Sequence, residues 1–210
     1  GQVLPVTLEG VTLTAELENG TVITGQSTIA QAPSPIKNVY LTPKNSKPLP
    51  EVLTAIEKAE VIILGPGSLF TSIVPNLLVP GVVEAIRKAR GGKYYICNVM
   101  TQPGETSGFT AFQHLEALEN YLGTGAIDYF IANKNGSLPP ELKERYLEEG
   151  AEPVFLDEEK ISAKNIKVIK APVISGKEVI RHDSKRLGAV IMESLLEEEH
   201  FLKQSMTRKG

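Results

Sequence analysis

The first 24 residues alternate apolar and polar side chains in the manner of β-strands. Residues 11–17 read Val-Thr-Leu-Thr-Ala-Glu-Leu, and Asn19-Gly20 separates them from a second short run at 21–24. Alternation places the apolar side chains on one face of a strand, and Asn-Gly supplies residues that accept a positive φ in a tight turn. The pattern predicts a β-hairpin, followed by a mostly irregular connector at 31–50 that contains a short strand at 39–41.

From residue 50 onward the pattern changes to apolar stripes with helical spacing that alternate with short, continuous apolar runs. The stripes cover residues 50–59, 81–90 and 109–122, and the continuous runs cover 61–64, 94–98 and 127–132. Continuous apolar runs are typical of strands that are buried on both faces of a sheet. Strands and helices in strict alternation imply right-handed crossovers and a parallel sheet. We therefore expect an α/β fold with a Rossmann-like parallel sheet, helices on both of its faces, and an N-terminal β-hairpin region.

The last third of the chain is less regular. It contains a charged helix at 139–149, three short strand candidates, and a final helix at 184–199 that ends in three glutamates. Glutamates at a helix C-terminus oppose the macrodipole, so we expect this end to fray into a basic tail. The strand candidates are residues 153–156, 166–169 and 178–180. The expected organisation is a hairpin region with its connector at 1–48, a Rossmann-like α/β domain at 49–200, and a basic tail at 201–210.

Composition and charge narrow the class of protein. The 210 residues are 41% apolar and 22% charged, which is enough to bury a sizeable core. Lysine and arginine number 22 against 25 acidic residues, so no strongly basic surface for nucleic acid is indicated. The single cysteine, Cys97, excludes an intrachain disulfide and favours a reducing compartment. No apolar run reaches the roughly 18 residues of a membrane helix. We expect a cytoplasmic protein whose partner is neither nucleic acid nor a membrane.

Polar loops follow three of the predicted strands, at the edge where open parallel sheets bind their ligands. They are Gly65-Pro66-Gly67-Ser68, the segment 98–106, and Asn133-Lys134-Asn135-Gly136. Each loop combines glycine with side chains that form hydrogen bonds. We therefore expect the candidate site at this edge, with Asn98, Thr101 and Thr106 near a sugar or base and Asn133 of the third loop also among the ligand-binding residues.

The first of these loops has the most specific pattern. Its two glycines allow a close approach of the backbone, and Ser68 is suited to cap a short helix at 69–74. Free amides at the start of that helix, together with the hydroxyl groups of Ser68, Thr71 or Ser72, would suit a phosphate or diphosphate. No lysine follows the glycines, so this is neither a Walker loop nor the dinucleotide fingerprint. An ordinary capped strand-to-helix turn explains the local pattern equally well.

The remaining polar candidates have both functional and structural explanations. Glu105 could be a base or a metal ligand, or it could be a solvated loop carboxylate. Arg181, at a strand end, is suited to a bidentate contact with a diphosphate. Tyr146 could stack on a base, although a half-buried structural tyrosine is the commoner case. His182-Asp183 lacks the further ligands of a metal hydrolase, and Ser184 could accept a phosphoryl group at a helix N-terminus.

Several stretches of the chain together resemble the YvcK/CofD-like family, and within it the YvcK or gluconeogenesis factor branch. They are residues 3–7, 65–72, 75–79, 97–106 and 181–183, of which Gly-Pro-Gly-Ser and Asn-Val-Met-Thr-Gln-Pro-Gly-Glu-Thr are the most specific. The resemblance implies a Rossmann-like fold and a cytoplasmic bacterial protein that binds nucleotide-diphosphate sugars such as UDP-sugars. Members of this branch are linked to gluconeogenic growth, cell shape and cell-wall precursor supply. The other branch transfers a phospholactyl group from a guanosine-diphosphate donor to a deazaflavin precursor, with magnesium.

The chain departs from the family pattern at two places. Phe70 stands where members usually have tyrosine. The family's opening glycine-rich loop and its Asp-Asp-Gly-Gly block, which would hold phosphates and metal, have no counterpart here. We therefore expect the chain to correspond to the later two thirds of a complete member, with the N-terminal part of the family fold absent from the Rossmann-like domain. Any Mg²⁺ would then belong to a complete chain.

Three hypotheses for function follow from the residues and the resemblance. The first is a nucleotide-sugar-binding regulatory protein rather than an enzyme, with the amides of Gly67, Ser68 and Leu69 and the side chain of Arg181 on the diphosphate. The second is a magnesium-dependent phospholactate transferase. The third is a partner surface formed by the acidic stretch 195–199 and the basic tail. The formation of a homo-oligomer is left open by all three.

Overall fold

The computed structural model describes residues 1–134, 140–175 and 180–207. A three-stranded antiparallel sheet has the order β2-β1-β3 and is built from β1 (Thr12–Leu17), β2 (Val22–Thr24) and β3 (Ile36–Thr42). A four-stranded sheet has the order β4-β5-β6-β7, and all of its pairs are parallel. Its strands are β4 (Val61–Leu64), β5 (Gly92–Ile96), β6 (Tyr129–Asn133) and β7 (Lys167–Ala171). A short antiparallel pair, β8 (Ile174–Ser175) with β9 (Arg181–His182), completes the strands of the described residues.

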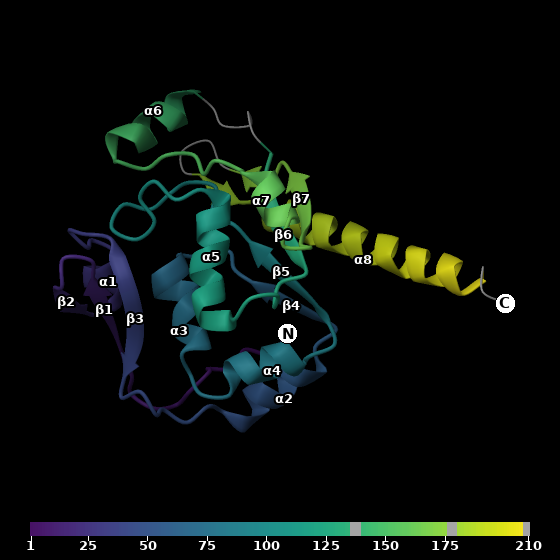
Figure 1. Ribbon diagram of the computed structural model, residues 1–210, viewed down its shortest axis with the longest axis horizontal. Coiled ribbons are helices and arrows are strands. Elements are labelled where there is room, and N and C mark those ends of the chain that lie inside the picture. The colour runs from purple at the N-terminus through teal and green to yellow at the C-terminus, as the bar shows by residue number, and fades with distance from the viewer. Residues whose placement is uncertain (135–139, 176–179, 208–210) are drawn as a thin grey trace.

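Helices lie on both faces of the parallel sheet, which confirms the predicted α/β class (Figure 1). The helical elements are α1 (Gln26–Ile29), α2 (Pro50–Lys58), the π-helix η1 (Leu69–Ile73), α3 (Val74–Leu77), α4 (Val82–Lys88), α5 (Ala111–Leu122), α6 (Pro140–Glu148), α7 (Glu158–Ser162) and α8 (Ser184–Thr207). Helices α3 and α5 lie between the two large sheets, whereas α8 packs on the opposite face of the parallel sheet and projects from the body.

Alternate side chains of the parallel strands enter two different apolar clusters. In β5, Tyr95 belongs to the cluster that α5 and the antiparallel sheet cover, whereas Tyr94 belongs to the cluster under α8. The first cluster includes Leu17 and Val39 of the antiparallel sheet, so the two large sheets share one core. Because the central strands β5 and β6 carry buried apolar side chains on both faces, their sequences contain continuous apolar runs, as expected for a covered parallel sheet.

The N-terminal hairpin is confirmed, although its turn differs from the expected one. The turn spans residues 18–20, with a hydrogen bond from the Leu17 amide to the Thr21 carbonyl, and only Gly20 has a positive φ. Asn19 instead accepts a hydrogen bond from the Thr21 amide with its side-chain oxygen. A three-residue turn needs one left-handed residue rather than two, which explains why Asn19 keeps an ordinary backbone conformation.

Several predicted element boundaries are corrected. The connector at 31–50 contains the seven-residue strand β3 rather than a three-residue one, because β1 offers its second edge to it over nearly its whole length. Residues 153–156 form only an isolated bridge, from Pro153 to Met100, and not a strand. Helix α8 continues to Thr207 instead of fraying near 199, and Glu197 pairs with Lys167 of β7. Positions 178 and 179 of a further predicted strand lie outside the described residues.

Within the described ranges, no single helix is long and apolar enough to cross a membrane. Two consecutive helical segments, Leu69–Leu77 and Val82–Lys88, are together long and apolar enough for a membrane span, but they are bent by 80° relative to each other. Most apolar side chains of this pair belong to the shared core. The finding agrees with the absence of a long apolar run in the sequence.

Candidate functional site

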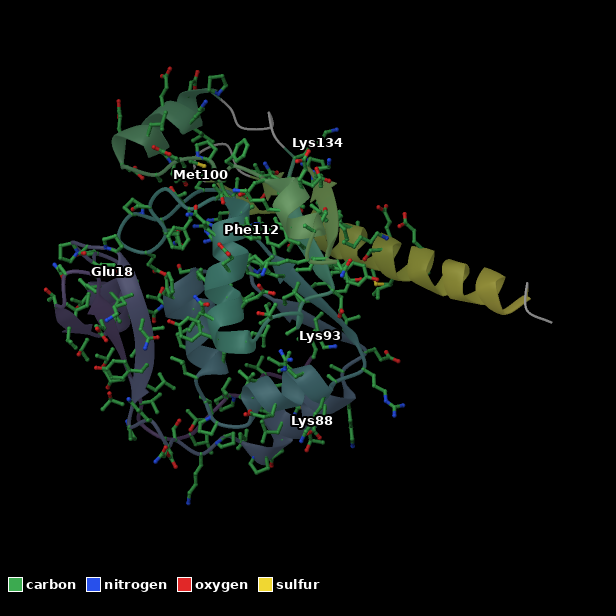
Figure 2. All side chains as sticks on the ribbon, in the orientation of Figure 1. Glu18, Lys88, Lys93, Met100, Phe112 and Lys134 are labelled. Carbon is green, nitrogen blue, oxygen red and sulfur yellow. The ribbon has the colours of Figure 1, made fainter. Side chains whose placement is uncertain are left out.

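A cavity of about 600 Å³ lies at the carboxyl ends of β4 and β5, and we call it the main cavity. Its wall combines the turn at Gly67 and Ser68, the loop from Asn98 to Glu105, Tyr146 of α6, and the segment 180–182. The loop follows β5 and carries Met100, which lies below α6 in the view of Figure 2. Two of the three loops predicted to form the site therefore meet here. Asn133, from the third loop, lines a neighbouring cavity instead.

The Gly-Pro-Gly-Ser turn approaches β5 closely. Gly65 has a φ of 96°, and a Cβ atom there would lie 3.1 Å from the carbonyl oxygen of Ile96. A side chain at this position would be both strained and crowded, so glycine is required. Gly67 and Ser68 follow on the cavity side, and their amides donate no hydrogen bond to any other residue that the structure describes. Two backbone donors at the wall of the main cavity therefore have no partner among the described residues.

The helix after this turn differs from the expected capped helix. It begins as the π-helix η1, in which the Ser68 carbonyl accepts hydrogen bonds from both the Ser72 and the Ile73 amides. The Ser68 hydroxyl does not cap it, so that prediction is wrong. The expected helix at 69–74 is instead divided: η1 ends at Ile73, and α3 begins at Val74 and contains Pro75 in its first turn.

The start of η1 is held by a carboxylate of the protein itself. The Phe70 amide donates to one oxygen of Glu105 at 3.1 Å, and the Thr71 hydroxyl donates to the other at 2.7 Å. Glu105 is only 4% exposed, so it is not the solvated loop carboxylate that was one of the expectations. Burial raises the pKa of its carboxyl group, and the hydrogen bonds from Thr71 and Phe70 oppose that rise only in part. An anion does bind this helix start, but it is Glu105.

The remaining predicted residues of η1 are therefore not presented to the main cavity. Leu69 is fully buried, and Thr71 is buried with its hydroxyl on Glu105. Ser72 is exposed but does not line the cavity. Of the first loop, only Gly67 and Ser68 face the space where a ligand would lie.

A chain of side-chain hydrogen bonds joins the two loops across the main cavity. The side-chain amide of Asn98 donates a hydrogen bond to the side-chain oxygen of Gln102 at 3.0 Å. The side-chain amide of Gln102 in turn donates to the Ser68 hydroxyl at 2.9 Å. Gln102 was not among the predicted site residues. Its position inside a loop rich in amides and hydroxyls was the available signal, but the partner lies 34 residues away in sequence. These hydrogen bonds fix the orientation of Asn98, which, like Val99, lines both this cavity and the neighbouring one.

The two threonines of this loop mainly shape the loop. The Thr101 amide and hydroxyl bond to the carbonyl and the amide of Glu152, although Thr101 also lines the main cavity. Thr106 is fully buried, and its hydroxyl oxygen accepts a hydrogen bond from the backbone N–H of Gln102. The sequence placed both residues at the correct edge of the sheet. Their hydroxyls, however, are already used within the protein.

The segment 180–182 supplies the side chains opposite the turn. Arg181 is exposed, lines the main cavity, and has no ion pair or hydrogen bond to its guanidinium in the part of the chain that the structure describes. His182, which was not predicted as a site residue, also lines the cavity and places Nε2 3.2 Å from the Cys97 carbonyl. Burial lowers the pKa of His182, so its neutral form is favoured. The hydroxyl of Tyr146 accepts from the Ile180 amide and holds this segment against α6.

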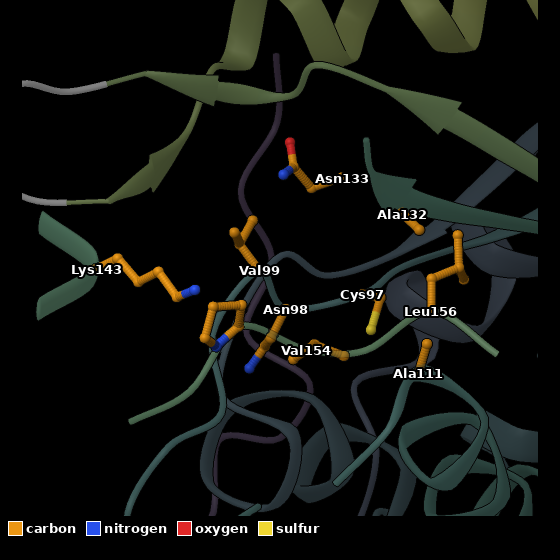
Figure 3. A pocket seen from close by; sticks show the side chains of 10 residues that line it. Cys97, Asn98, Val99, Ala111, Ala132, Asn133, Lys143, Val154 and Leu156 are labelled. Carbon is orange, nitrogen blue, oxygen red and sulfur yellow. The ribbon is translucent and has the colours of Figure 1, made fainter. Parts of the chain in front are cut away.

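A second cavity, of about 220 Å³, lies beside the first between the carboxyl ends of β5 and β6, and we call it the small cavity (Figure 3). Asn98 and Val99 line both cavities. Cys97 contributes its sulfur to the small cavity, and burial raises the pKa of the thiol, which keeps it protonated. Apolar side chains make up most of the remaining wall.

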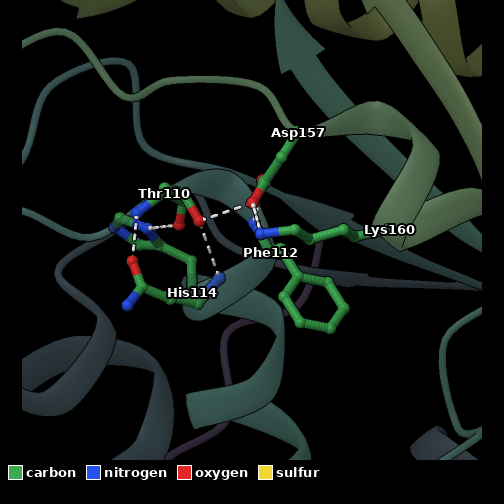
Figure 4. Close-up of polar contacts among 6 residues, drawn as sticks. Thr110, Phe112, His114, Asp157 and Lys160 are labelled. Atoms are coloured by element: carbon green, nitrogen blue, oxygen red, sulfur yellow. Dashed lines mark hydrogen bonds and ion pairs between the residues drawn. The ribbon is translucent and has the colours of Figure 1, made fainter.

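The wall of the small cavity depends on a carboxylate that joins α5 to α7. Asp157 accepts hydrogen bonds from the Thr110 hydroxyl at 2.9 Å and from the Phe112 amide at 2.8 Å (Figure 4). It thereby satisfies a donor at the start of α5, next to Ala111 of the cavity wall. Burial alone would raise the pKa of Asp157, but these hydrogen bonds outweigh it and leave the pKa below its ordinary value.

Asp157→Ala is expected to lower the free energy of unfolding by about 1–2 kcal/mol at neutral pH, because it removes an acceptor from the start of α5. The lowered pKa means that this contribution is present above the ordinary aspartate pKa and is lost as the pH falls through the native value. Urea unfolding at several pH values measures both effects. Asp157→Asn keeps one acceptor and should cost less. An energy difference that persists unchanged in strong acid would contradict this role of the carboxylate.

A family model and several curated proteins match the sequence of the chain. Residues 1–174 match the protein family described as "2-phospho-L-lactate transferase CofD". The "Gluconeogenesis factor" of Bacillus subtilis is 46% identical over 198 residues, which are 94% of this chain and 62% of that protein. The protein of the same name from Halalkalibacterium halodurans is 45% identical over 194 residues, which are 92% of this chain and 60% of that protein.

A crystal structure of a protein from Bacillus halodurans has the same fold. It superposes with a TM-score of 0.87 at 44% sequence identity, over 91% of this chain and 62% of that one. The chain thus spans about 60% of the length of the curated relatives that it matches. These matches confirm the resemblance that the glycine-rich turn and the loop after β5 indicated.

Proposed function

Because the chain belongs to the CofD family and matches gluconeogenesis factors over most of its length, we propose that it is a nucleotide-diphosphate-sugar-binding regulatory protein of the YvcK type. The bound ligand in this proposal is a UDP-sugar. Binding would occur in the cytoplasm and would link cell-wall precursor supply and cell shape to gluconeogenic growth. The proposal concerns binding and regulation and requires no bond to be broken.

The observation that supports the proposal most directly is the position of Arg181. Its guanidinium is exposed at the main cavity, and nothing in the described ranges pairs with it. The amides of Gly67 and Ser68 face the same cavity without partners among the described residues. A planar guanidinium together with backbone N–H donors suits a diphosphate, whose oxygens accept several charge-assisted hydrogen bonds.

The size and lining of the main cavity fit a ligand of this class. A volume of about 600 Å³ lies within the usual range of small-molecule sites. The amide chain from Asn98 through Gln102 to Ser68 provides further donors and acceptors in fixed orientation. The chain has a net charge of -3, so attraction of the anion depends on local groups such as Arg181 rather than on the overall field.

Titration calorimetry of the full-length protein with UDP-glucose tests the proposal. Saturable binding is expected, and Arg181→Ala should weaken it by about 10- to 100-fold, as for the loss of one charge-assisted contact. Arg181→Lys should recover part of this loss, because it keeps the charge but not the bidentate geometry. Lys185→Ala is the matched control, because it removes a nearby exposed charge outside the cavity. Equal affinities for Arg181→Ala and the unmodified protein would remove Arg181 from the site.

A magnesium-dependent phospholactate transferase is the second candidate, favoured by the description of the matching family. The residues described here do not fit a magnesium site on their own, because no three acidic, histidine or cysteine side chains gather among them. Glu105, the buried carboxylate of the main cavity, already accepts from Phe70 and Thr71. Incubation with a guanosine-diphosphate phospholactyl donor and a deazaflavin acceptor distinguishes the candidates. A transferred phospholactyl group would favour the enzyme, and UDP-sugar binding without transfer would favour the regulator.

A further inference from the structure

The small cavity neighbours the main cavity, and Asn98 and Val99 line both of them. We infer that the small cavity binds the single-ring base of a uridine nucleotide, while the main cavity holds the diphosphate and the sugar. This inference rests on the proposed function and adds the location of the base and the groups that select it.

The size of the small cavity favours one ring. Its volume of about 220 Å³ is below the usual range for whole ligands, so it accommodates a fragment of a ligand rather than all of one. A pyrimidine has one ring and a purine has two. Part of the boundary is formed by the core residues Cys97 just after β5, Ala132 of β6 and Ala111 at the start of α5, which leaves that side little freedom to expand.

The lining favours a base over a sugar. Its polar side chains are those of Asn98, Asn133 and Lys143, and the others are apolar apart from the Cys97 thiol. A hexose carries hydroxyl groups around its ring, and each buried hydroxyl without a partner is costly. A nucleobase has two apolar faces and a polar edge. The small cavity offers apolar walls and a few polar groups, which matches the base.

The polar groups favour uracil among the single-ring bases. One Asn98 N–H is used by Gln102, whereas the Asn98 oxygen accepts no hydrogen bond from the described part of the chain. That oxygen can accept from the N3–H of uracil, and cytosine has no hydrogen at this nitrogen. Lys143 extends from α6 toward Val99, and its amine can donate to a uracil carbonyl (Figure 3). Gln102, itself bonded to Ser68, holds Asn98 in this orientation. The hydrogen bonds that border the diphosphate site therefore also orient the Asn98 side chain, which selects the base.

The test compares ligands that contain different parts of the nucleotide, using the full-length protein. Affinities are measured by calorimetry for inorganic pyrophosphate, UDP, CDP and GDP. We expect UDP to bind at least tenfold more tightly than pyrophosphate, CDP or GDP. Affinity for GDP or CDP equal to that for UDP would overturn the inference. If neither pyrophosphate nor UDP binds, the proposed function fails and the inference fails with it.

Two variants separate the small cavity from the diphosphate site. Val154→Phe should fill the small cavity and reduce the affinity for UDP at least tenfold to the level of pyrophosphate, without changing the affinity for pyrophosphate. Val154→Ala is the matched control and should keep the binding of UDP. UDP affinity that is unchanged in a folded Val154→Phe protein would overturn the inference and leave the proposed function intact.

Lys143→Ala provides a test that does not depend on a core substitution, because Lys143 is exposed on α6. The substitution should weaken the binding of UDP by about three- to tenfold and leave the binding of pyrophosphate unchanged. By contrast, Arg181→Ala should weaken the binding of both UDP and pyrophosphate. An equal loss of UDP and pyrophosphate in Lys143→Ala would place this amine at the phosphates and would overturn its assignment to the base.

Discussion

Glu105→Ala should lower the free energy of unfolding by about 4 kcal/mol, because it leaves two buried donors without an acceptor. The Phe70 amide and the Thr71 hydroxyl both bond to this carboxylate, at 3.1 and 2.7 Å. Neither donor can reach bulk water, since Phe70 and Thr71 are buried at the start of η1. Urea unfolding followed by circular dichroism measures the loss.

Glu105→Gln is the matched control, because it keeps one acceptor oxygen and similar volume. It should cost about 1 kcal/mol at neutral pH, which is the net worth of one ordinary hydrogen bond. Burial raises the pKa of Glu105, so the native state holds the proton more tightly than the unfolded state. Stability should therefore fall as the pH rises from the ordinary glutamate value through the native pKa, and Glu105→Gln should flatten this step. Equal losses for alanine and glutamine would contradict the role of the acceptor oxygens.

The position of Glu105 also changes the explanation of the glycine-rich turn. The sequence indicated an anion at the start of the following helix, and the structure places a carboxylate of the protein there. The backbone N–H groups that remain available to a ligand are those of Gly67 and Ser68, just before η1. A diphosphate in the main cavity would thus bind ahead of η1 rather than on its first turn.

Local patterns predicted most of the fold. The strand at 61–64 and the helix beginning at Pro50 are found where the apolar spacing indicated them, because each spacing is set by its own segment. The length of β3 was underestimated, because its outer residues are strands only through pairing with β1, about 20 to 30 residues earlier. The same limit applies to 153–156, which runs beside the loop at Val99 and Thr101 without becoming a strand.

The candidate site was predicted by location more successfully than by role. The rule that ligands bind at the carboxyl ends of parallel strands placed Ser68 and Asn98 at the edge where both line one cavity, which Arg181, proposed separately from its place at a strand end, also lines. It could not show that the Thr106 hydroxyl is used by Gln102, or that Lys143 of α6 reaches a second cavity. Those contacts join segments far apart in sequence, and a single sequence contains no signal for them.

The loop that forms the cavity wall also depends on a contact with the antiparallel sheet region. Gly104 has a φ of 81°, and a Cβ atom there would lie 2.7 Å from the Ala30 carbonyl oxygen and 2.8 Å from the Ala32 nitrogen. Both neighbours are backbone atoms, so they cannot move aside as a flexible side chain could. Gly104 is thus the point at which the loop packs against the end of α1.

Gly104→Ala is therefore expected to cost about 3 kcal/mol or more, from the left-handed backbone and the overlap together. The displacement should also move the neighbouring Glu105 and weaken the binding of UDP-glucose. Gly108→Ala is the control in the same loop, because its φ is 71° but nothing lies within 4 Å of the added Cβ. It should cost only about 1–2 kcal/mol, from the backbone conformation alone, and should leave binding unchanged. If thermal and urea unfolding gave equal losses for the two variants, the contact with residues 30–32 would not be what positions the loop.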